Sequence, residues 1–391
     1  MLLRRCSVLM IESRERLAFD LSLVAAGGSG LHHKIEWCAL APHLAEDVLL
    51  TIEEATTICA ISPSRWNQIE DLAVQHRRCV LDALLDKRLL VAEGTETHES
   101  DLALRNTHWR AASAVAHYRS RWHAVDTEQA EQEFAENSET TLLAQLGPAP
   151  PPVRERSSPE VRQRLERPLS TALDDLLDRR VTCRNYDRSR SLTSSQFSSV
   201  LYRAFGARAV DHYAPGVQLL KKGAPSAGGL HPTEAYLLVQ RVDGIEPGLY
   251  HYHPIEHALE PINVVGPDMA AALAKRFVAA QAYFVDAHVL VVPTGRFIRN
   301  FWKYRNHAKA YRALILDVGH LSQTLYLAAT ELGLGAFITA AINEVDIEEA
   351  FGLDPLVEGP LAVCGFGIRA QERTEVEFDP LHMVWPSTDN V

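Results

Sequence analysis

A turn followed by a strand is the segment of this sequence best suited to hold a flat ligand. Pro225 and Ser226 are residue types that start turns, and Gly228 and Gly229 leave the backbone without Cβ atoms. The run Ala235–Val239 then reads as a buried strand. A planar ring could lie against such a bare backbone. A tight turn before a core strand explains the same residues without any ligand.

A second candidate site is an alternation of two arginines and a threonine, at Arg180, Thr182 and Arg184. Alternate side chains of an extended segment point to the same side, so these three could converge on one anion. The guanidinium group offers a planar fork of donors that suits phosphate oxygens. A solvated, charged edge is the competing interpretation.

Several motifs in order resemble the nitroreductase superfamily, and in particular its SagB-type dehydrogenases, which mature ribosomally made peptides. The turn resembles the flavin-binding turn of that superfamily, and Arg180–Tyr186 is similar to its Arg-x-Ser-x-Arg-x-aromatic pattern. The other motifs follow in the order of the family: Gly248–Pro254, Lys303-Tyr304, Asp317–His320, Gly333–Gly335 and Gly365–Gly367. The resemblance spans about residues 170–370. It implies an α+β, nitroreductase-like FMN-binding fold with a central mixed sheet layered with helices.

The resemblance implies that FMN is the cofactor. It assigns the phosphate and ribityl contacts to Arg180, Thr182 and Arg184. It assigns the ring contacts to the turn residues Pro225, Ser226, Ala227, Gly228, Gly229 and Leu230. We expect Gly333 and Gly335 to be secondary contacts, although a helix C-cap explains them equally well. Arg369, which follows the last glycine motif, is a weaker candidate for the phosphate.

The same resemblance implies that Lys303 and Tyr304 are the catalytic pair. In SagB-type azoline dehydrogenases a Lys-Tyr pair at this place assists proton removal while a hydride passes to the flavin. A lysine shielded from water holds its proton less tightly and can act as a base, and an adjacent phenol can relay a proton. Taken alone, such a dipeptide is typical of an exposed surface. Arg305 stands where the family has glycine, which leaves room for a different substrate.

The sequence therefore predicts an FMN-dependent dehydrogenase that matures a ribosomally synthesised peptide, oxidising azoline rings to azoles. An NAD(P)H-dependent flavin reductase of dehydroamino acids or nitro groups stays open. No G-x-G-x-x-G fingerprint opens a βαβ unit, but such enzymes bind nicotinamide only transiently. A non-catalytic scaffold that binds a leader peptide is the alternative of another class. The expected partners are the precursor peptide, a cyclodehydratase or other maturation enzymes, and a second copy of the chain in a homodimer.

Composition limits the alternatives. The chain has 391 residues, of which 47% are hydrophobic, so it can bury a large core. A net charge of −11 argues against a nucleic-acid binder. Six cysteines without a C-x-x-C pair predict neither a zinc cluster nor a disulfide framework, and they favour a cytoplasmic location. There is no apolar run long enough for a membrane span, and Glu12 and Arg14 come too early for a signal peptide.

The histidines His251, His253 and His257 have a spacing that could bind a metal. Alternate histidines on one face of a hairpin explain the spacing more simply, so no metal is expected. His231 and His320 are interpreted as packing or hydrogen-bonding histidines.

We expect two domains joined by an acidic and proline-rich linker at 126–168, which contains the acidic run Glu128–Glu139. The N-terminal domain, 1–125, reads as strands, a capped helix and a longer helix in an order that resembles a winged helix. Acidic residues on its longer helix favour peptide binding or packing over DNA. The C-terminal domain, 169–391, alternates helices and strands. The expected elements are strands at Ser7–Ile11, Ile35–Leu40, Lys87–Ala92, Ala235–Gln240, Ala287–Val292 and Leu361–Cys364, and helices from Thr51, after Trp66, at Leu169–Leu177, from Thr193 and at Ala308–Leu332.

Overall fold

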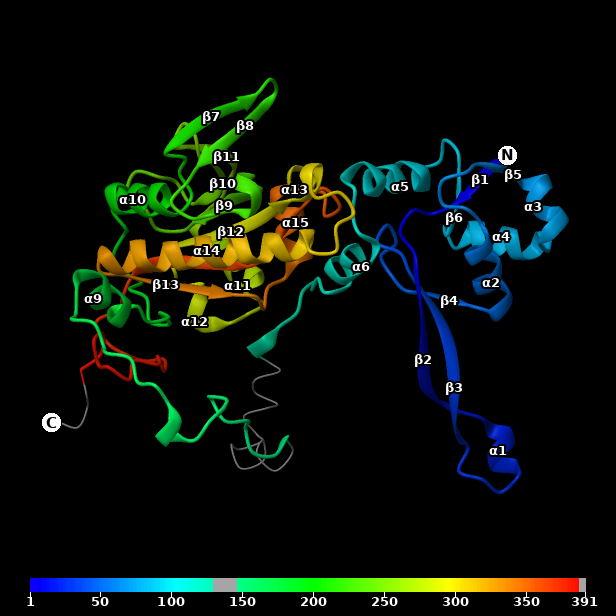
Figure 1. Ribbon diagram of the computed structural model, residues 1–391, viewed down its shortest axis with the longest axis horizontal. Helices are drawn as coiled ribbons and strands as arrows, with labels where there is room; N and C mark the ends of the chain where they lie inside the picture. The colour runs from blue at the N-terminus through cyan, green and yellow to red at the C-terminus, as the bar shows by residue number, and fades with distance from the viewer. Residues whose placement is uncertain (129–145, 387–391) are drawn as a thin grey trace.

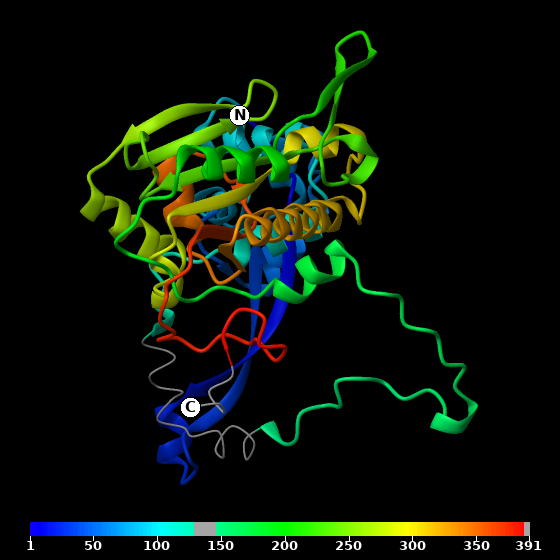
Figure 2. The same ribbon diagram turned by 90° about the vertical axis from the view of Figure 1, so that its left-hand side faces the viewer.

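The computed structural model describes residues 1–128 and 146–386 (Figure 1). Most of the predicted acidic run, Glu128–Glu139, lies outside these residues. An N-terminal region, coloured blue to cyan, lies beside a larger body coloured green to red. Residues 146–171 are exposed and mostly extended, apart from the short 3₁₀ helix η1 (Pro159–Val161). Figure 2 shows this segment swinging out and away from the body.

A seven-stranded sheet forms the centre of the body, in the order β11-β10-β9-β12-β15-β13, with β14 paired to β12. Its strands are β9 (Thr233–Val239), β10 (Gly248–His253), β11 (Ala258–Val264), β12 (Val289–Arg296), β13 (Leu334–Thr339), β14 (Glu358–Pro360) and β15 (Val363–Ile368). All pairings between these strands are antiparallel. The sheet is mixed only at its edge, where Thr182 forms a parallel bridge to Ala336.

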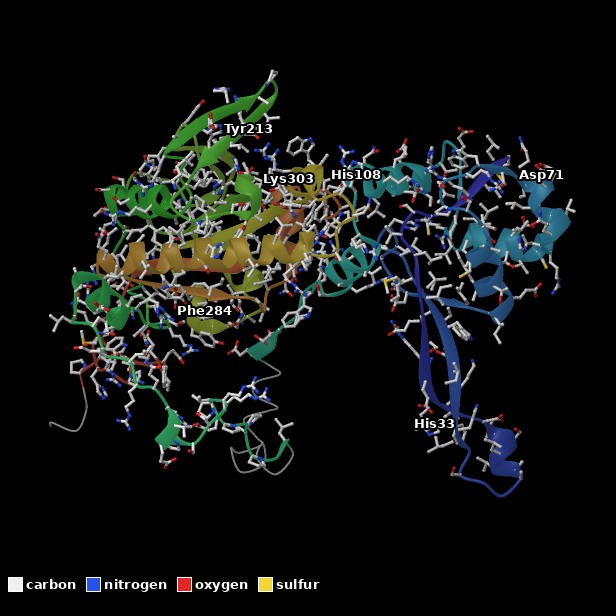
Figure 3. The ribbon with its side chains drawn as sticks, viewed as in Figure 1. His33, Asp71, His108, Tyr213, Phe284 and Lys303 are labelled. Carbon is white, nitrogen blue, oxygen red and sulfur yellow. The ribbon has the colours of Figure 1, made fainter. Side chains whose placement is uncertain are left out.

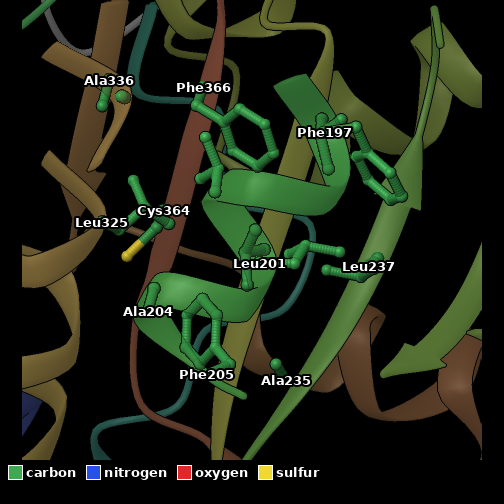
Figure 4. Close-up of a cluster of buried hydrophobic side chains, with 14 of the residues drawn as sticks. Phe197, Leu201, Ala204, Phe205, Ala235, Leu237, Leu325, Ala336, Cys364 and Phe366 are labelled. Atoms are coloured by element: carbon green, nitrogen blue, oxygen red, sulfur yellow. The ribbon is translucent and has the colours of Figure 1, made fainter. Parts of the chain in front are cut away.

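Helices cover both faces of the sheet because its strands are apolar on both sides. Leu237 and Val239 of β9 pack with helices α10 and α14, whereas Leu238 between them packs with α11, α12 and α15. Successive side chains of a strand point to opposite faces, so β9 is buried on both of its faces. Figure 4 shows the first of these clusters, in which Phe197 and Leu201 of α10 lie against the sheet. The body's helices are α9 (Ala172–Arg179), α10 (Ser194–Ala204), α11 (Pro267–Phe277), α12 (Ala282–Val285), α13 (Phe297–Lys303), α14 (Ala310–Glu331) and α15 (Glu344–Phe351).

The elements expected from the sequence of the body are confirmed with small shifts of their ends. The long helix expected at Ala308–Leu332 is α14, and Thr193 caps α10 with the expected capping box. The hairpin β7 (Ala209–Ala214) and β8 (Val217–Lys221) leads into the glycine-rich turn, which contains the 3₁₀ helix η2 (Ala227–Gly229).

The N-terminal region has its own core around a small sheet of order β5-β1-β6. The strands are β1 (Leu2–Arg5), β5 (Asn67–Gln68) and β6 (Leu90–Ala92), and the helices packed on them are α2 (Ile52–Ala60), α3 (Ile69–Gln75) and α4 (Arg78–Asp86). Thr51 caps α2 with the predicted capping box. Three helices, α2, α3 and α4, precede β6, where the winged-helix interpretation expected two.

Two expectations for this region are wrong in detail. The longer helix after Trp66 is broken at His76 and Arg77, which have extended backbones, so that α3 and α4 can each bury an apolar face in one core. The strand expected at Ser7–Ile11 forms only at its last two residues, Met10 and Ile11. The Ser7 backbone N–H donates to the Asp101 carboxylate, 2.5 Å away, rather than to a neighbouring strand. Strand β2 therefore begins only at Met10.

A long hairpin projects from the N-terminal region in both views (Figures 1 and 2). It consists of β2 (Met10–Phe19) and β3 (Leu31–Leu40), joined through the short helix α1 (Leu21–Ala25), and β4 (Val48–Leu50) pairs with its base. No residue of α1 is buried. No helix in the described part of the chain combines the length and the apolar character needed to cross a bilayer.

Helices α5 (Glu96–Thr107) and α6 (Ala111–Arg119) connect the N-terminal region to the body. Between them Trp109 is 4% exposed and packs on Phe297 and Phe301 of α13, with ring centroids 4.5 and 4.7 Å away. Its indole N–H donates to the Leu356 carbonyl at 2.9 Å. The two regions therefore meet through a buried aromatic cluster next to α13.

The close packing of β13 against β15 can be tested at Gly365. A Cβ at this position would lie 2.1 Å from Cε1 of Phe337, which is itself buried and stacked on Phe284 at 3.9 Å. We expect Gly365→Ala to lower the free energy of unfolding by about 1–3 kcal/mol. Gly319→Ala, at an exposed position of α14 with open space around it, should raise it by about 1 kcal/mol. Urea unfolding followed by circular dichroism measures both, and equal changes in the two variants would contradict the packing argument.

Candidate functional site

The glycine-rich turn is held in place by a carboxylate from helix α14. Asp317 accepts hydrogen bonds from the Ser226 hydroxyl at 2.5 Å and from the Ala227 backbone N–H at 3.1 Å. The Ser226 oxygen in turn accepts the His231 backbone N–H at 3.0 Å. Burial raises the pKa of Asp317, and the hydrogen bonds from Ser226 and Ala227 offset part of this rise. The turn is thus tied to the buried side of the longest helix in the described chain.

The predicted catalytic pair lies directly over this turn. Gly228 has a φ of 63°, and a Cβ on it would lie 2.5 Å from the Tyr304 hydroxyl and 2.7 Å from Lys303 Nζ. Lys303 ends α13 and Tyr304 follows as its C-cap, so the helix delivers both side chains to the same point. The Lys303 ammonium is 5.6 Å from the centroid of the Tyr304 ring. Figure 3 places Lys303 beside the junction with the N-terminal region.

One premise of the sequence-based prediction is not met within the single chain. Lys303 was expected to be shielded from water, but its side chain is exposed, as are Gly228 and Arg305. Lys303 ends α13 with its side chain at the surface, and Tyr304, which follows it, is half-buried. The single chain therefore leaves Lys303 open to solvent.

Two of the three predicted phosphate contacts converge on α14. The guanidinium of Arg180 is 5.4 Å from the centroid of the Tyr326 ring, and the Thr182 hydroxyl is 3.0 Å from the Tyr326 hydroxyl. Tyr326 and Asp317 are nine residues apart on the same helix, or about 14 Å along its axis. A single helix therefore supports both the arginine motif and the glycine-rich turn.

Arg184 does not join them. Its guanidinium lies 5.3 Å from the Tyr283 ring and donates to the Val376 carbonyl at 2.8 Å. The prediction that all three side chains converge is therefore wrong in this chain. The motif is not one continuous strand, because only Thr182 pairs with the sheet edge, so strict alternation does not apply.

Glu377 holds the backbone of Arg184 and the side chain of Arg369. Its fully buried carboxylate accepts the backbone N–H groups of Arg184 and Asn185 at 2.6 and 3.0 Å, the Asn185 amide at 2.9 Å, and the Arg369 guanidinium and Trp385 indole at 2.8 Å each. Burial would raise the pKa of Glu377, but these hydrogen bonds and the charge of Arg369 outweigh it and lower that pKa. Arg369 is therefore committed to an internal ion pair.

The other predicted residues have structural roles. Gly333 has a φ of 71° and ends α14, and a Cβ on Gly335 would lie 2.3 Å from Cys183 Sγ. The histidines predicted as a hairpin face have separate partners. His251 bonds to Glu234 and Glu260, His257 bonds to Ser198 and Tyr252, and His253 accepts the Glu256 backbone N–H. No cluster of three potential metal ligands occurs among the described residues.

Lys222 is a candidate that the sequence did not single out. It lies three residues before Pro225, its side chain is buried with 3% exposure, and it has no hydrogen bond or ion pair to any described residue. Burial lowers the pKa of Lys222, and the charge of Glu234 offsets this in part. Nothing in the local sequence distinguishes this lysine from a surface residue, because its burial depends on the packing of distant segments.

Comparisons with known proteins give a family and several relatives. The model of the nitroreductase family matches residues 177–368. "Putative nitroreductase MJ1384" of Methanocaldococcus jannaschii is 32% identical over 179 residues, which are 45% of this chain and 82% of that protein. The trifolitoxin-processing protein TfxB of Rhizobium leguminosarum bv. trifolii is 32% identical over 162 residues, 41% of this chain and 43% of that protein. The match thus spans less than half the length of TfxB.

Two further similarities concern a second peptide-processing system. The microcin B17-processing protein McbC of Escherichia coli is 23% identical over 192 residues, which are 47% of this chain and 65% of that protein. Among solved structures, the E. coli microcin synthetase McbBCD complex with truncated pro-MccB17 bound is similar with a TM-score of 0.47 and 22% identity, over 68% of this chain and 97% of that one.

The environment of the turn predicts a loss of stability in acid. Burial, together with the charges of Lys222, Lys221 and Arg299, lowers the pKa of His231 to about 4 from its ordinary 6.5. The unfolded chain therefore takes up the proton first, and the free energy of unfolding should fall as the pH drops from about 6.5 towards about 4. His231 has a φ of 43°, which asparagine tolerates. His231→Asn should flatten this slope in urea titrations, and an unchanged slope would contradict the assignment.

Proposed function

Because the chain belongs to the nitroreductase family, we propose that it is an FMN-dependent dehydrogenase that oxidises azoline rings of a ribosomally synthesised peptide to azoles. The proposal rests on one observation: Lys303 Nζ and the Tyr304 hydroxyl both lie close to the backbone of Gly228. The substrate class is supported by TfxB and McbC, which are named as processing proteins of trifolitoxin and microcin B17.

The residues of the site fit FMN in three respects. Gly229 has open space where a Cβ would stand, so the turn presents bare backbone to a flat ring, while Lys303 and Tyr304 occupy the space over Gly228. Lys222 offers a buried ammonium without a partner among the described residues, which suits an electron-rich group. Arg180 and Thr182 offer a guanidinium and a hydroxyl for the phosphate, with Tyr326 behind them. Bound FMN would supply the acceptor for the hydride that leaves the substrate.

The role of the protein's own groups is to move a proton. Aromatisation of an azoline removes one hydrogen as a hydride and another as a proton, and the proton needs a base. Lys303 Nζ is the candidate base, and the Tyr304 hydroxyl beside it can pass the proton on towards solvent. Both groups lie where a ring stacked over the turn would present its edge. An exposed ammonium becomes an effective base once a bound peptide excludes water from it.

A homodimer would also cover the site. Several large apolar side chains of α9 and α14 are exposed in the single chain, namely Leu173, Leu177, Ile315 and Leu316. Exposed apolar side chains on neighbouring helices are typical of a protein interface. A cyclodehydratase that makes the azoline is the expected partner upstream, because an azoline must form before it can be oxidised.

The second candidate function is an NAD(P)H-dependent flavin reductase of dehydroamino acids or nitro groups. The similarity to MJ1384 favours it. That protein is named as a nitroreductase, and the match covers 82% of its length. In that reaction Lys303 and Tyr304 would deliver a proton instead of removing one. A non-catalytic, leader-peptide-binding scaffold is the remaining alternative, and it requires no flavin.

The catalytic pair is tested by Lys303→Ala and Tyr304→Phe. Loss of general-base assistance should lower the rate about 10²–10⁴-fold while the FMN content stays constant. The assay follows the loss of two hydrogens by mass spectrometry when a thiazoline- or oxazoline-containing peptide is incubated with the enzyme in air. Lys309→Ala, an exposed lysine of the same loop, is the matched control and should keep its activity. Full activity in both pair variants would remove them from the mechanism.

The cofactor is tested by FMN binding. The purified protein should be yellow and release FMN on denaturation, and a colourless protein that takes up no added FMN would favour the scaffold. Arg180→Ala should weaken FMN binding by about 1.5–3 kcal/mol, because a charged hydrogen bond to phosphate is lost. Arg184→Ala should have a smaller effect, since its guanidinium already donates to Val376. Fluorescence titration measures both, and the reverse order would assign the phosphate to Arg184.

A further inference from the structure

A cavity of about 710 Å³ lies at the junction between the N-terminal region and the body. We call it the junction groove. Among the residues that line it are Val8, Leu104, His108, Trp109, Arg110 and Asn306. They come from the segment before β2, the end of α5, the start of α6 and the loop after α13. Its volume is in the range of specific ligand sites.

The junction groove lies close to Tyr304 of the predicted catalytic pair. The Asn306 backbone N–H donates to the His108 carbonyl at 3.1 Å, and both residues have left-handed backbones, with φ of 53° and 60°. Asn306 comes only two residues after Tyr304. His108 and Arg110 also line a narrow crevice in which Tyr304 is a wall. Figure 3 shows His108 and Lys303 near each other at this junction.

The charge of the junction groove is opposite to that of the whole chain. No aspartate or glutamate lines it, although the chain has a net charge of −11. Two arginines line it. Arg105 is occupied by the Asp101 carboxylate at 2.8 Å, but the exposed guanidinium of Arg110 has no hydrogen bond or ion pair within residues 1–128 and 146–386. Among the described residues, Arg110 is therefore a cation without a partner, and it lies next to the apolar side chains of the junction groove.

The apolar side chains that line the junction groove include a fixed one, Trp109, and a flexible one, Met10. Trp109 is fixed by its packing on α13 and by its hydrogen bond to Leu356. Met10 also lines the junction groove, and a methionine can adjust to differently shaped apolar partners. An apolar wall next to an unpaired guanidinium suits a chain that carries both apolar and acidic side chains.

We propose that the junction groove binds an acidic, apolar segment of the peptide substrate and leads the neighbouring residues to Tyr304. This rests on the proposed function for the existence of a peptide substrate, but the binding itself can be measured without turnover. The negative charge of the rest of the chain repels an acidic peptide, so the junction groove is where such a peptide is attracted. The site determines which peptides reach the catalytic pair, not the chemistry performed on them.

Two synthetic, fluorescently labelled peptides test the proposal. They have equal length and the same apolar residues, and one carries glutamates where the other carries lysines. Fluorescence anisotropy with the full-length, FMN-loaded protein should show tighter binding of the glutamate peptide, weakened by added salt. Arg110→Glu should weaken binding of that peptide by about tenfold. The control is Arg65→Glu, which makes the same charge change at an exposed arginine of the N-terminal region outside the junction groove. It should change binding by less than about twofold.

The outcomes separate the two proposals. Equal binding of the two peptides, or equal losses in the two variants, overturns the assignment of the junction groove. A change of molecular mass on light scattering in Arg110→Glu alone would mean that a second copy fills the groove, which also overturns it. A protein that binds the glutamate peptide through Arg110 but oxidises no azoline supports the groove while refuting the proposed function.

Discussion

The hydrogen bonds that the Asp317 carboxylate accepts are the interaction on which the candidate site depends. A turn with two adjacent glycines has many accessible backbone conformations, and a hydroxyl and a backbone N–H bonded to one carboxylate select a single one. Asp317 is buried on α14, whose apolar side chains pack against the central sheet. The turn thereby acquires the rigidity of the core. That rigidity is needed because Lys303 and Tyr304 approach Gly228 so closely that a small displacement would separate them or create a clash.

Features encoded by a few neighbouring residues could be predicted from the sequence. The capping boxes at Thr51 and Thr193 are local, and both are present. Strands buried on both faces, such as β9 and β12, were visible as short apolar runs, and α14 as a long periodic one. The turn and the Lys-Tyr pair were recognised by family resemblance, but only the fold brings them into contact across more than seventy residues of sequence.

Features that depend on distant partners could not be predicted. The N–H of Ser7 bonds to Asp101, 94 residues away, and the strand that the local sequence favours from Ser7 begins only at Met10. The motif around Arg184 is typical of a phosphate ligand. However, its guanidinium donates to Val376 and its backbone N–H to Glu377, both more than 190 residues later. In each case a long-range contact outweighs the local pattern.

The position of Glu377 has a consequence for the order of events in the cell. The arginine motif around residues 180–186 is completed by a carboxylate that the ribosome adds almost two hundred residues later. Domains form as the chain emerges, N-terminal parts first. The backbone N–H groups of Arg184 and Asn185 are an exception, since their acceptor is Glu377. A nascent chain could thus assemble its N-terminal region early, but the segment at Arg184 and Asn185 could not reach its final structure until translation had passed Glu377.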